Sequence, residues 1–143
     1  MHSIQVKKEF PASIDEVFDL MSKHATYNIA FAPMQVERIK DSADAEHPDG
    51  LGSVRAMGVG PLKPLKEQIT LFEPNARIEY QIIKNPLIKH HLGIIEFEAL
   101  ADDKTLVTYT IELQARAPFV SKLILAQLQA AIKLGLTKLA KSV

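Results

Sequence analysis

The chain of 143 residues carries 17 basic and 17 acidic side chains, a formal charge of zero, and no cysteine. This neutral balance argues against a nucleic-acid partner, because binding to phosphates draws on many uncompensated lysines and arginines. The lack of cysteine excludes disulfides, thiolate metal sites and cysteine nucleophiles, and favours a cytoplasmic protein. No hydrophobic run approaches the roughly 20 residues of a bilayer span, so we expect one domain over residues 1–143 without stable membrane insertion.

The start of the chain predicts one strand followed by two short helices. Residues 4–10 alternate between apolar and polar side chains, which is typical of a strand. Ser13 and Glu16 form a capping-box pattern, so a helix is predicted to begin at Ile14. A second helical segment is predicted over residues 25–31, because the proline that follows it lacks the backbone donor for a further turn.

The middle of the chain predicts a series of strands. Apolar and polar residues alternate with a period of two between turn sequences, such as Glu73-Pro74-Asn75 and residues 101–104. The predicted strands cover residues 34–40, 52–59, 65–72, 77–84, 90–100 and 106–116, with a polar loop over residues 41–51. Tight turns between consecutive strands favour an antiparallel meander. With the first strand, we expect a curved sheet of about seven strands.

The last predicted element is a long amphipathic helix over residues 119–141. At about 1.5 Å per residue it is long enough to cross the sheet from edge to edge. Its predicted apolar face comprises Val120, Ile124, Leu128, Ala131 and Leu134. Gln127, Gly135 and Lys138 project to the same side, which indicates that the helix covers a surface that is imperfectly dry or contains more than protein.

Three local sequences, found in order along the chain, carry a resemblance to a known family. Residues 10–18 predict a strand that runs through a proline into a capped helix, residues 52–54 a strand that starts at a glycine, and residues 67–74 a strand with a proline-containing turn. Together with the element order, they make the chain resemble the SRPBCC superfamily, the START-like helix-grip proteins, in its polyketide cyclase/dehydrase-like branch. The chain departs from many relatives at Phe31-Ala32-Pro33, where they carry a tryptophan.

The resemblance implies an α+β, Bet v 1-like helix-grip fold with a cavity between the sheet and the C-terminal helix. In this superfamily the cavity commonly holds lipids, polyketides or other small, mostly hydrophobic molecules, and no cofactor is implied. Alternation along the strands and the helical period together place a set of side chains around such a cavity. The predicted ligand-binding residues are Met57, Val59, Glu67, Ile69, Tyr80, Ile82, His91, Ile95, Phe97, Tyr109, Ile111, Leu113, Leu123, Gln127, Leu128 and Ala131.

Four of these residues carry groups able to move protons, and each has two interpretations. His91 either exchanges a proton with a bound hydroxyl or carbonyl, or is a partly buried histidine near a strand end. Glu67 is either an acid or base whose pKa burial raises, or the partner of Arg55. Tyr80 and Tyr109 either present their hydroxyls to the cavity or pack in the core.

Three positions of the helix have similar pairs of interpretations. Gln127 is expected to hydrogen-bond a ligand, or else a water or a tyrosine hydroxyl. Gly135 permits either a close approach to a strand or room for a ligand, and either would offset its low helix propensity. Lys138 is expected to cover apolar surface with its stem while its ammonium group reaches water.

The sequence leaves three classes of function open. The first is binding of a small hydrophobic molecule, and the second is a polyketide cyclase or dehydratase of the lyase or isomerase type. The third is an interaction module with a collapsed pocket, and the protein is expected to be a monomer or a homodimer. After Glu112 the chain has only basic charges, which suits transient membrane contact. Metal binding is not expected, because His90 and His91 point to opposite faces of a strand.

Overall fold

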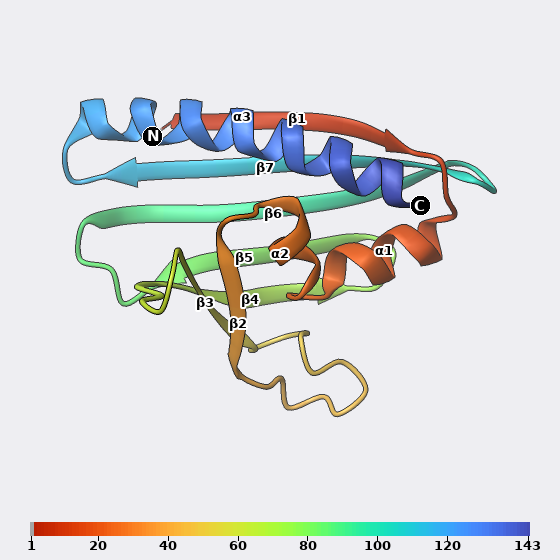
Figure 1. Cartoon of the computed structure of the whole chain (residues 1–143), viewed down its shortest axis with the longest axis horizontal. Coiled ribbons are helices and arrows are strands. Elements are labelled where there is room, and N and C mark those ends of the chain that lie inside the picture. Colours follow the sequence, from red (N-terminus) through yellow and green to blue (C-terminus); the bar gives the residue numbers. More distant parts are fainter. Residues whose placement is uncertain (1) are drawn as a thin grey trace.

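The protein consists of one curved antiparallel sheet, two short helices and a long C-terminal helix (Figure 1), in a computed structural model that describes residues 2–143. The strands are β1 (His2–Phe10), β2 (Gln35–Lys40), β3 (Val54–Gly58), β4 (Leu65–Glu73), β5 (Arg77–Ile83), β6 (Ile88–Ala101) and β7 (Lys104–Ala115). The helices are α1 (Ile14–Ser22), α2 (Thr26–Ala30) and α3 (Pro118–Ser142). The helix-grip architecture expected from the sequence is therefore confirmed.

The seven strands lie in the order β1-β7-β6-β5-β4-β3-β2, with every neighbouring pair antiparallel. Consecutive strands from β2 to β7 are neighbours, as the predicted meander requires. Strand β1 lies at one edge of the sheet, next to β7, and β2 lies at the opposite edge. The chain must therefore cross from one edge of the sheet to the other between β1 and β2. Helices α1 and α2 make that connection.

Helix α1 begins where the capping pattern predicts, since the Ser13 hydroxyl accepts a hydrogen bond from the Glu16 amide at 3.3 Å. The helix buries Phe18 among the core side chains. The Phe18 ring packs edge-on against Phe72, at 5.4 Å between centroids, and against Phe97, at 5.0 Å. This aromatic cluster fills one end of the space inside the sheet.

A bulge in β4 changes which side chains face inward. The β4–β5 pairing shifts register between Ile69 and Leu71, because the extra residue has no partner across the strands. Beyond the shift, Phe72 packs against the core. Strict alternation from Ile69 predicts Leu71 on the inner face, and this prediction is wrong for that reason.

Helix α3 packs along β1 and β7 and against α2, rather than crossing the sheet from edge to edge (Figure 1). Its fully covered side comprises Ser121, Leu125, Ile132, Gly135, Leu136, Leu139 and Ala140. The apolar face predicted from sequence lies beside this one, and Leu134 on it is 59% exposed. Among residues 2–143, α3 is the one helix whose length and hydropathy suit a bilayer span. That finding rests on length and composition alone, so the absence of stable membrane insertion stays a prediction.

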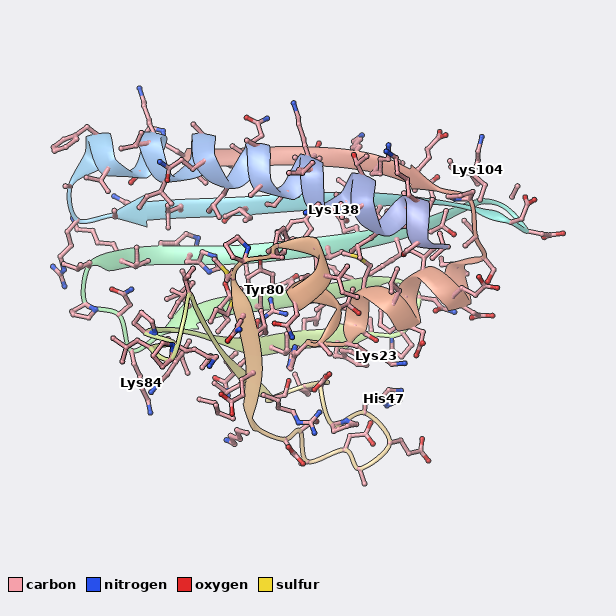
Figure 2. The ribbon with its side chains drawn as sticks, viewed as in Figure 1. Lys23, His47, Tyr80, Lys84, Lys104 and Lys138 are labelled. Atoms are coloured by element: carbon pink, nitrogen blue, oxygen red, sulfur yellow. The ribbon has the colours of Figure 1, made fainter. Side chains whose placement is uncertain are left out.

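Gly135 marks a close approach between α3 and α2. A methyl group at this position would lie 2.9 Å from Cε1 of Phe31 and 3.1 Å from the carbonyl oxygen of Ala30. The glycine therefore permits helix–helix packing; the neighbour is α2 and not a strand. Charged side chains such as Lys23, Lys84 and Lys104 project away from the body of the molecule, whereas Tyr80 lies inside it (Figure 2).

Candidate functional site

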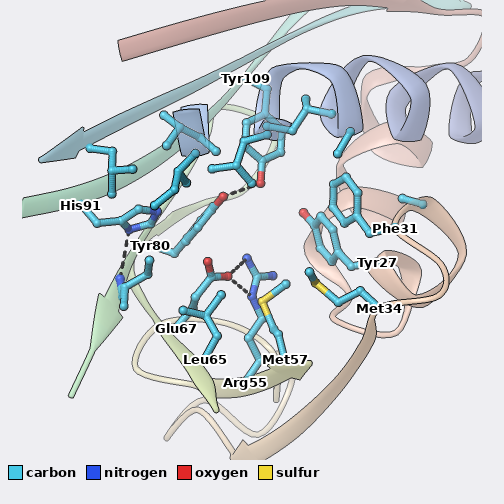
Figure 3. Close-up of a pocket in the computed structure, with 18 of the residues that line it drawn as sticks. Tyr27, Phe31, Met34, Arg55, Met57, Leu65, Glu67, Tyr80, His91 and Tyr109 are labelled. Atoms are coloured by element: carbon cyan, nitrogen blue, oxygen red, sulfur yellow. Dashed lines mark hydrogen bonds and ion pairs between the residues drawn. The ribbon is translucent and has the colours of Figure 1, made fainter. Parts of the chain in front are cut away.

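A cavity of about 370 Å³ lies between the inner face of the sheet, α2 and α3 (Figure 3). Its walls come from strands β3 to β7, from the α2–β2 segment and from one side of α3. The volume is at the lower end of the usual range of about 300–1,000 Å³ for small-molecule sites. The cavity is not filled by its own side chains, which contradicts the collapsed-pocket alternative; whether the chain dimerises stays a prediction.

Most of the predicted residues line this cavity. They are Met57, Glu67, Tyr80, Ile82, His91, Tyr109, Ile111, Leu113, Leu128 and Ala131. Alternation along the strands located most of them, because the strand residues among them project from the concave face of the sheet. Their role in binding a ligand stays a prediction.

Six predicted residues lie outside the cavity lining. Val59 follows the end of β3 in a loop and is 66% exposed. Leu123, 61% exposed, and Gln127, also exposed, each precede a cavity residue of α3 by one position, so they point about 100° away. The others, Ile69, Ile95 and Phe97, are buried in the core.

Several cavity residues were missing from the predicted set. They include Tyr27, Ala30, Phe31, Met34, Arg55, Leu65, Asn85, Ile88, Ile124, Ile132, Leu134 and Lys138. For Arg55 the sequence did carry a signal, since it shares the inward parity of Met57 on β3. For the cavity residues in and around α2, the sequence carried no such signal. The position of this segment beside the open side of the sheet follows from tertiary packing.

The central polar feature of the cavity is a buried ion pair between neighbouring strands. Arg55 on β3 is directly opposite Glu67 on β4, and the Arg55 Nε and Nη2 atoms each lie 2.9 Å from Glu67 Oε1 (Figure 3). Burial raises the pKa of the Glu67 carboxyl, and the adjacent guanidinium acts in the opposite direction. The interpretation of Glu67 as the partner of Arg55 is confirmed, and the pair also faces the cavity.

Two tyrosine rings hold the guanidinium in place. Its central carbon lies 4.7 Å from the ring centroid of Tyr27 and 4.7 Å from that of Tyr80. A cation within about 6 Å of an aromatic face is attracted by the ring quadrupole. Arg55 is therefore held by two aromatic rings and, at its Nε–Nη2 edge, by Glu67.

A second set of polar groups supports Arg55 from outside the cavity. Arg55 Nη1 lies 3.4 Å from His24 Nδ1, and His24 Nε2 lies 3.1 Å from Ser53 Oγ. A guanidinium only donates, so Nδ1 accepts and Nε2 carries the proton. Burial, with a smaller effect of Arg55, lowers the pKa of His24 to about 4, so the ring is neutral at pH 7. Asp49 accepts a hydrogen bond from the His24 backbone amide at 2.9 Å.

The residue types Ser53, His24 and Asp49 resemble those of a nucleophilic triad, but the geometry does not support one. Ser53 is fully buried and does not line the cavity. Nε2 of His24 is near both Ser53 and an Asp49 oxygen at 3.7 Å, whereas a triad uses the two ring nitrogens for the two partners. The group therefore positions Arg55.

The hydroxyl of Tyr80 meets that of the third tyrosine, Tyr109, in the cavity wall. The hydroxyls of Tyr80 on β5 and Tyr109 on β7 lie 2.5 Å apart. Burial raises the pKa of both groups, so both remain protonated at neutral pH. Gly93 on β6 is directly opposite Tyr80, and the Tyr80 ring lies across the space where a side chain at position 93 would be. Both predicted tyrosines line the cavity and also belong to the buried core, with their hydroxyls bonded to each other.

His91 completes the polar part of the lining. The Ile82 backbone amide donates a hydrogen bond of 3.0 Å to His91 Nδ1, so the neutral ring carries its proton on Nε2. Burial lowers the pKa of His91 to about 4. At neutral pH this side chain is a hydrogen-bond donor toward the cavity. It is not poised to accept a proton there, which corrects half of the predicted role.

Within residues 2–143 no cluster of three histidine or acidic side chains is placed to hold a metal ion. The polar groups can hydrogen-bond an oxygen or a hydroxyl, and they can stabilise developing charge on a bound carbonyl compound.

Comparison with known proteins agrees with this architecture. The family model described as "Polyketide cyclase / dehydrase and lipid transport" matches residues 1–143. A search of curated proteins finds no match. The Zhui aromatase/cyclase from Streptomyces sp. R1128 is similar in structure, with a TM-score of 0.78, 16% identity, and coverage of 99% of this chain and 92% of that one.

Two further solved structures show the same fold. A START superfamily protein from Mycobacterium smegmatis has a TM-score of 0.77 and 14% identity, covering 100% of this chain and 97% of that one. Norcoclaurine synthase from Thalictrum flavum, solved with dopamine and hydroxybenzaldehyde, has a TM-score of 0.72 and 19% identity, covering 99% and 87%. At these identities the likeness establishes the fold alone.

Proposed function

Because this chain belongs to the polyketide cyclase/dehydrase and lipid transport family, we propose that it binds a small, mostly hydrophobic molecule between its sheet and α3. The observation that carries the proposal is the cavity of about 370 Å³, whose wall is mainly aliphatic and aromatic. Such a wall favours apolar ligands, since each buried CH₂ group contributes about 0.8 kcal/mol. A few polar groups in one region of the wall then orient the ligand.

A fluorescence titration tests this proposal. N-phenyl-1-naphthylamine is uncharged and apolar, and its emission rises when it leaves water. We expect saturable binding to the wild-type chain, and a loss of at least tenfold in affinity for Ala131→Trp, because Ala131 lines the cavity. Ala130→Trp is the matched control, since both alanines are exposed on α3 and only Ala131 lines the cavity. Equal binding by the two variants would refute a site in the cavity.

A second function is favoured by one specific observation: His91, Glu67, Tyr80 and Tyr109, on four different strands, converge on a single cavity. A donor such as His91 Nε2–H polarises a carbonyl oxygen, and a tyrosine hydroxyl can give a proton to a developing alkoxide. An aldol-type cyclisation or a dehydration of a polyketide-like chain also needs a base to take an α-proton, and among these four side chains the Glu67 carboxylate is the group able to take it.

The enzymatic proposal is tested with a short poly-β-keto thioester as substrate. Cyclised or dehydrated product is expected to form faster with the protein than without it, and His91→Gln and Tyr109→Phe should each lower the rate by at least tenfold. If both variants retain the wild-type rate while the naphthylamine still binds, the catalytic proposal fails and the binding proposal stands.

A further inference from the structure

An arginine in an apolar cavity suggests at first a site for an anionic ligand, yet the Arg55 guanidinium is already engaged. Its Nε and Nη2 atoms contact Glu67 Oε1, and its Nη1 atom contacts His24. The rings of Tyr27 and Tyr80 each lie with their centroids 4.7 Å from its central carbon. A ligand carboxylate binds arginine best through two parallel N–H groups of one edge, and the Nε–Nη2 edge is taken by Glu67.

The charges in the cavity also argue against an anionic ligand. Glu67 balances Arg55, so the pair presents no net charge to the cavity. A ligand carboxylate placed beside it would lose its water and lie next to a second carboxylate, and an unpaired buried charge costs several kcal/mol. The remaining titratable groups that face the cavity are Tyr27, Tyr80, Tyr109, His91 and Lys138. Lys138 is exposed, so the deep part of the cavity contains no uncompensated cation.

The hydrogen-bonding atoms that remain free in the cavity suit an uncharged group of the ligand. Every fully buried side-chain nitrogen or oxygen of the described residues has a hydrogen-bond partner. Glu67 makes its hydrogen bonds through Oε1, and His91 makes its hydrogen bond through Nδ1. Glu67 Oε2 and His91 Nε2 therefore remain without a partner among the side-chain hydrogen bonds of the described residues. Both free atoms are therefore accessible from the cavity, which the two side chains line. They offer one acceptor and one donor.

We infer that the polar part of the cavity selects an uncharged hydroxyl- or carbonyl-bearing apolar ligand over the corresponding carboxylate. A ligand hydroxyl donates to Glu67 Oε2, and a ligand oxygen accepts from His91 Nε2–H. This inference rests on the proposed binding function and specifies its ligand class. Fatty acids and phosphate-bearing lipids are disfavoured, and alcohols, phenols and ketones are favoured.

The test is displacement of bound N-phenyl-1-naphthylamine by a matched pair, 1-octanol and octanoate, at pH 8. Octanol is expected to bind at least tenfold more tightly than octanoate. In Glu67→Gln the Arg55 charge loses its partner, so the preference should reverse in favour of octanoate. Lys122→Met should leave the wild-type ratio within twofold, because Lys122 is exposed on α3 and lies outside the cavity lining.

The outcomes separate this inference from the proposal on which it rests. Octanoate binding as tightly as octanol, or a probe that neither compound displaces, overturns the inference and leaves the binding function standing. A probe that does not bind at all contradicts the binding function itself.

A second variant covers the case in which Glu67→Gln does not fold. The double variant Arg55→Met/Glu67→Met removes both charges together, which is far less damaging than leaving one of them unpaired. Its affinity for octanol, measured relative to its affinity for the naphthylamine, should fall at least fivefold below the wild-type ratio. An unchanged ratio would place the ligand hydroxyl elsewhere and overturn the inference.

Discussion

Replacing Gly93 with alanine should displace Tyr80 and with it the polar part of the cavity. A methyl group at position 93 would lie 2.6 Å from Cε2 of the Tyr80 ring and nearer still to Cζ and Cε1. The ring cannot simply move aside, because Arg55 packs on its face and Tyr109 bonds its hydroxyl. The substitution is therefore an overpacking change at the centre of the candidate site.

The magnitude follows from the contacts that would be lost. Overpacking a core typically costs about 1–3 kcal/mol. Loss of the hydrogen bond between Tyr80 and Tyr109 adds about 1 kcal/mol, and a weakened cation–π contact adds about 0.5–1 kcal/mol. Alanine also restricts the unfolded chain, which stabilises the folded state by about 0.4–1 kcal/mol. We expect Gly93→Ala to lower the free energy of unfolding by about 1.5–4.5 kcal/mol.

Urea unfolding of a double-mutant cycle tests the cause as well as the size. Valine at position 80 is short and does not reach across to Gly93, so in the Tyr80→Val background the Gly93→Ala change should be neutral or stabilising. The two substitutions would then couple by about 1.5–5.5 kcal/mol. Additivity within about 0.5 kcal/mol would refute the idea that Gly93 exists to admit the Tyr80 ring.

Two other predictions concern the buried ionisable groups. The pKa values of His24 and His91 are about 4 in the folded protein against 6.5 for the free side chain, so the unfolded state binds more protons between these pH values. Stability should therefore be lost as the pH falls from about 6.5 to about 4, by up to about 3 kcal/mol per histidine. Urea unfolding at several pH values should show a smaller slope for His91→Gln, and an unchanged slope would contradict this pKa. Separately, Arg55→Met should cost about 3–5 kcal/mol by leaving Glu67 unpaired, whereas Arg55→Met/Glu67→Met should cost much less; equal losses in urea unfolding would argue against a buried ion pair.

Local patterns in the sequence were sufficient for most of the fold. Alternation with a period of two located the strands, and the Ser13 capping pattern located the start of α1. The same alternation placed Glu67, Tyr80, His91 and Tyr109 toward the cavity, because side-chain direction in a regular strand is a local property. It misjudged the end of β4, where the bulge is a property of the pairing.

The face of α3 predicted from the sequence lines the cavity, but the stripe that packs into the core could not be separated from it because the helix is apolar on two adjacent stripes. One stripe, through Leu125, Ile132 and Leu136, packs into the core, and the next, through Ile124 and Leu128, lines the cavity. Hydrophobic periodicity alone does not decide between two such stripes. Only packing against β1, β7 and α2 does.

The chemistry of the site depended on contacts between segments far apart in the chain. The proton position on His91 follows from the hydrogen bond of the Ile82 amide, and the neutralisation of Arg55 from Glu67. The sequence suggested the second contact through the inward parity of both residues, but gave no sign of the first. In the sequence, Gly93 is only a small residue on a strand. Its role follows from the Tyr80 ring, which occupies the space of a side chain at position 93.

Native mass spectrometry of the freshly purified chain, followed by denaturing extraction, tests the central claim most directly. We predict a species heavier than the 15.9 kDa chain by one small molecule. Extraction should release an uncharged, mostly apolar compound, retained by Ala130→Trp and lost from Ala131→Trp. A ligand carried equally by both variants, or a bare chain that also fails to take up added octanol, would contradict a binding cavity beneath α3.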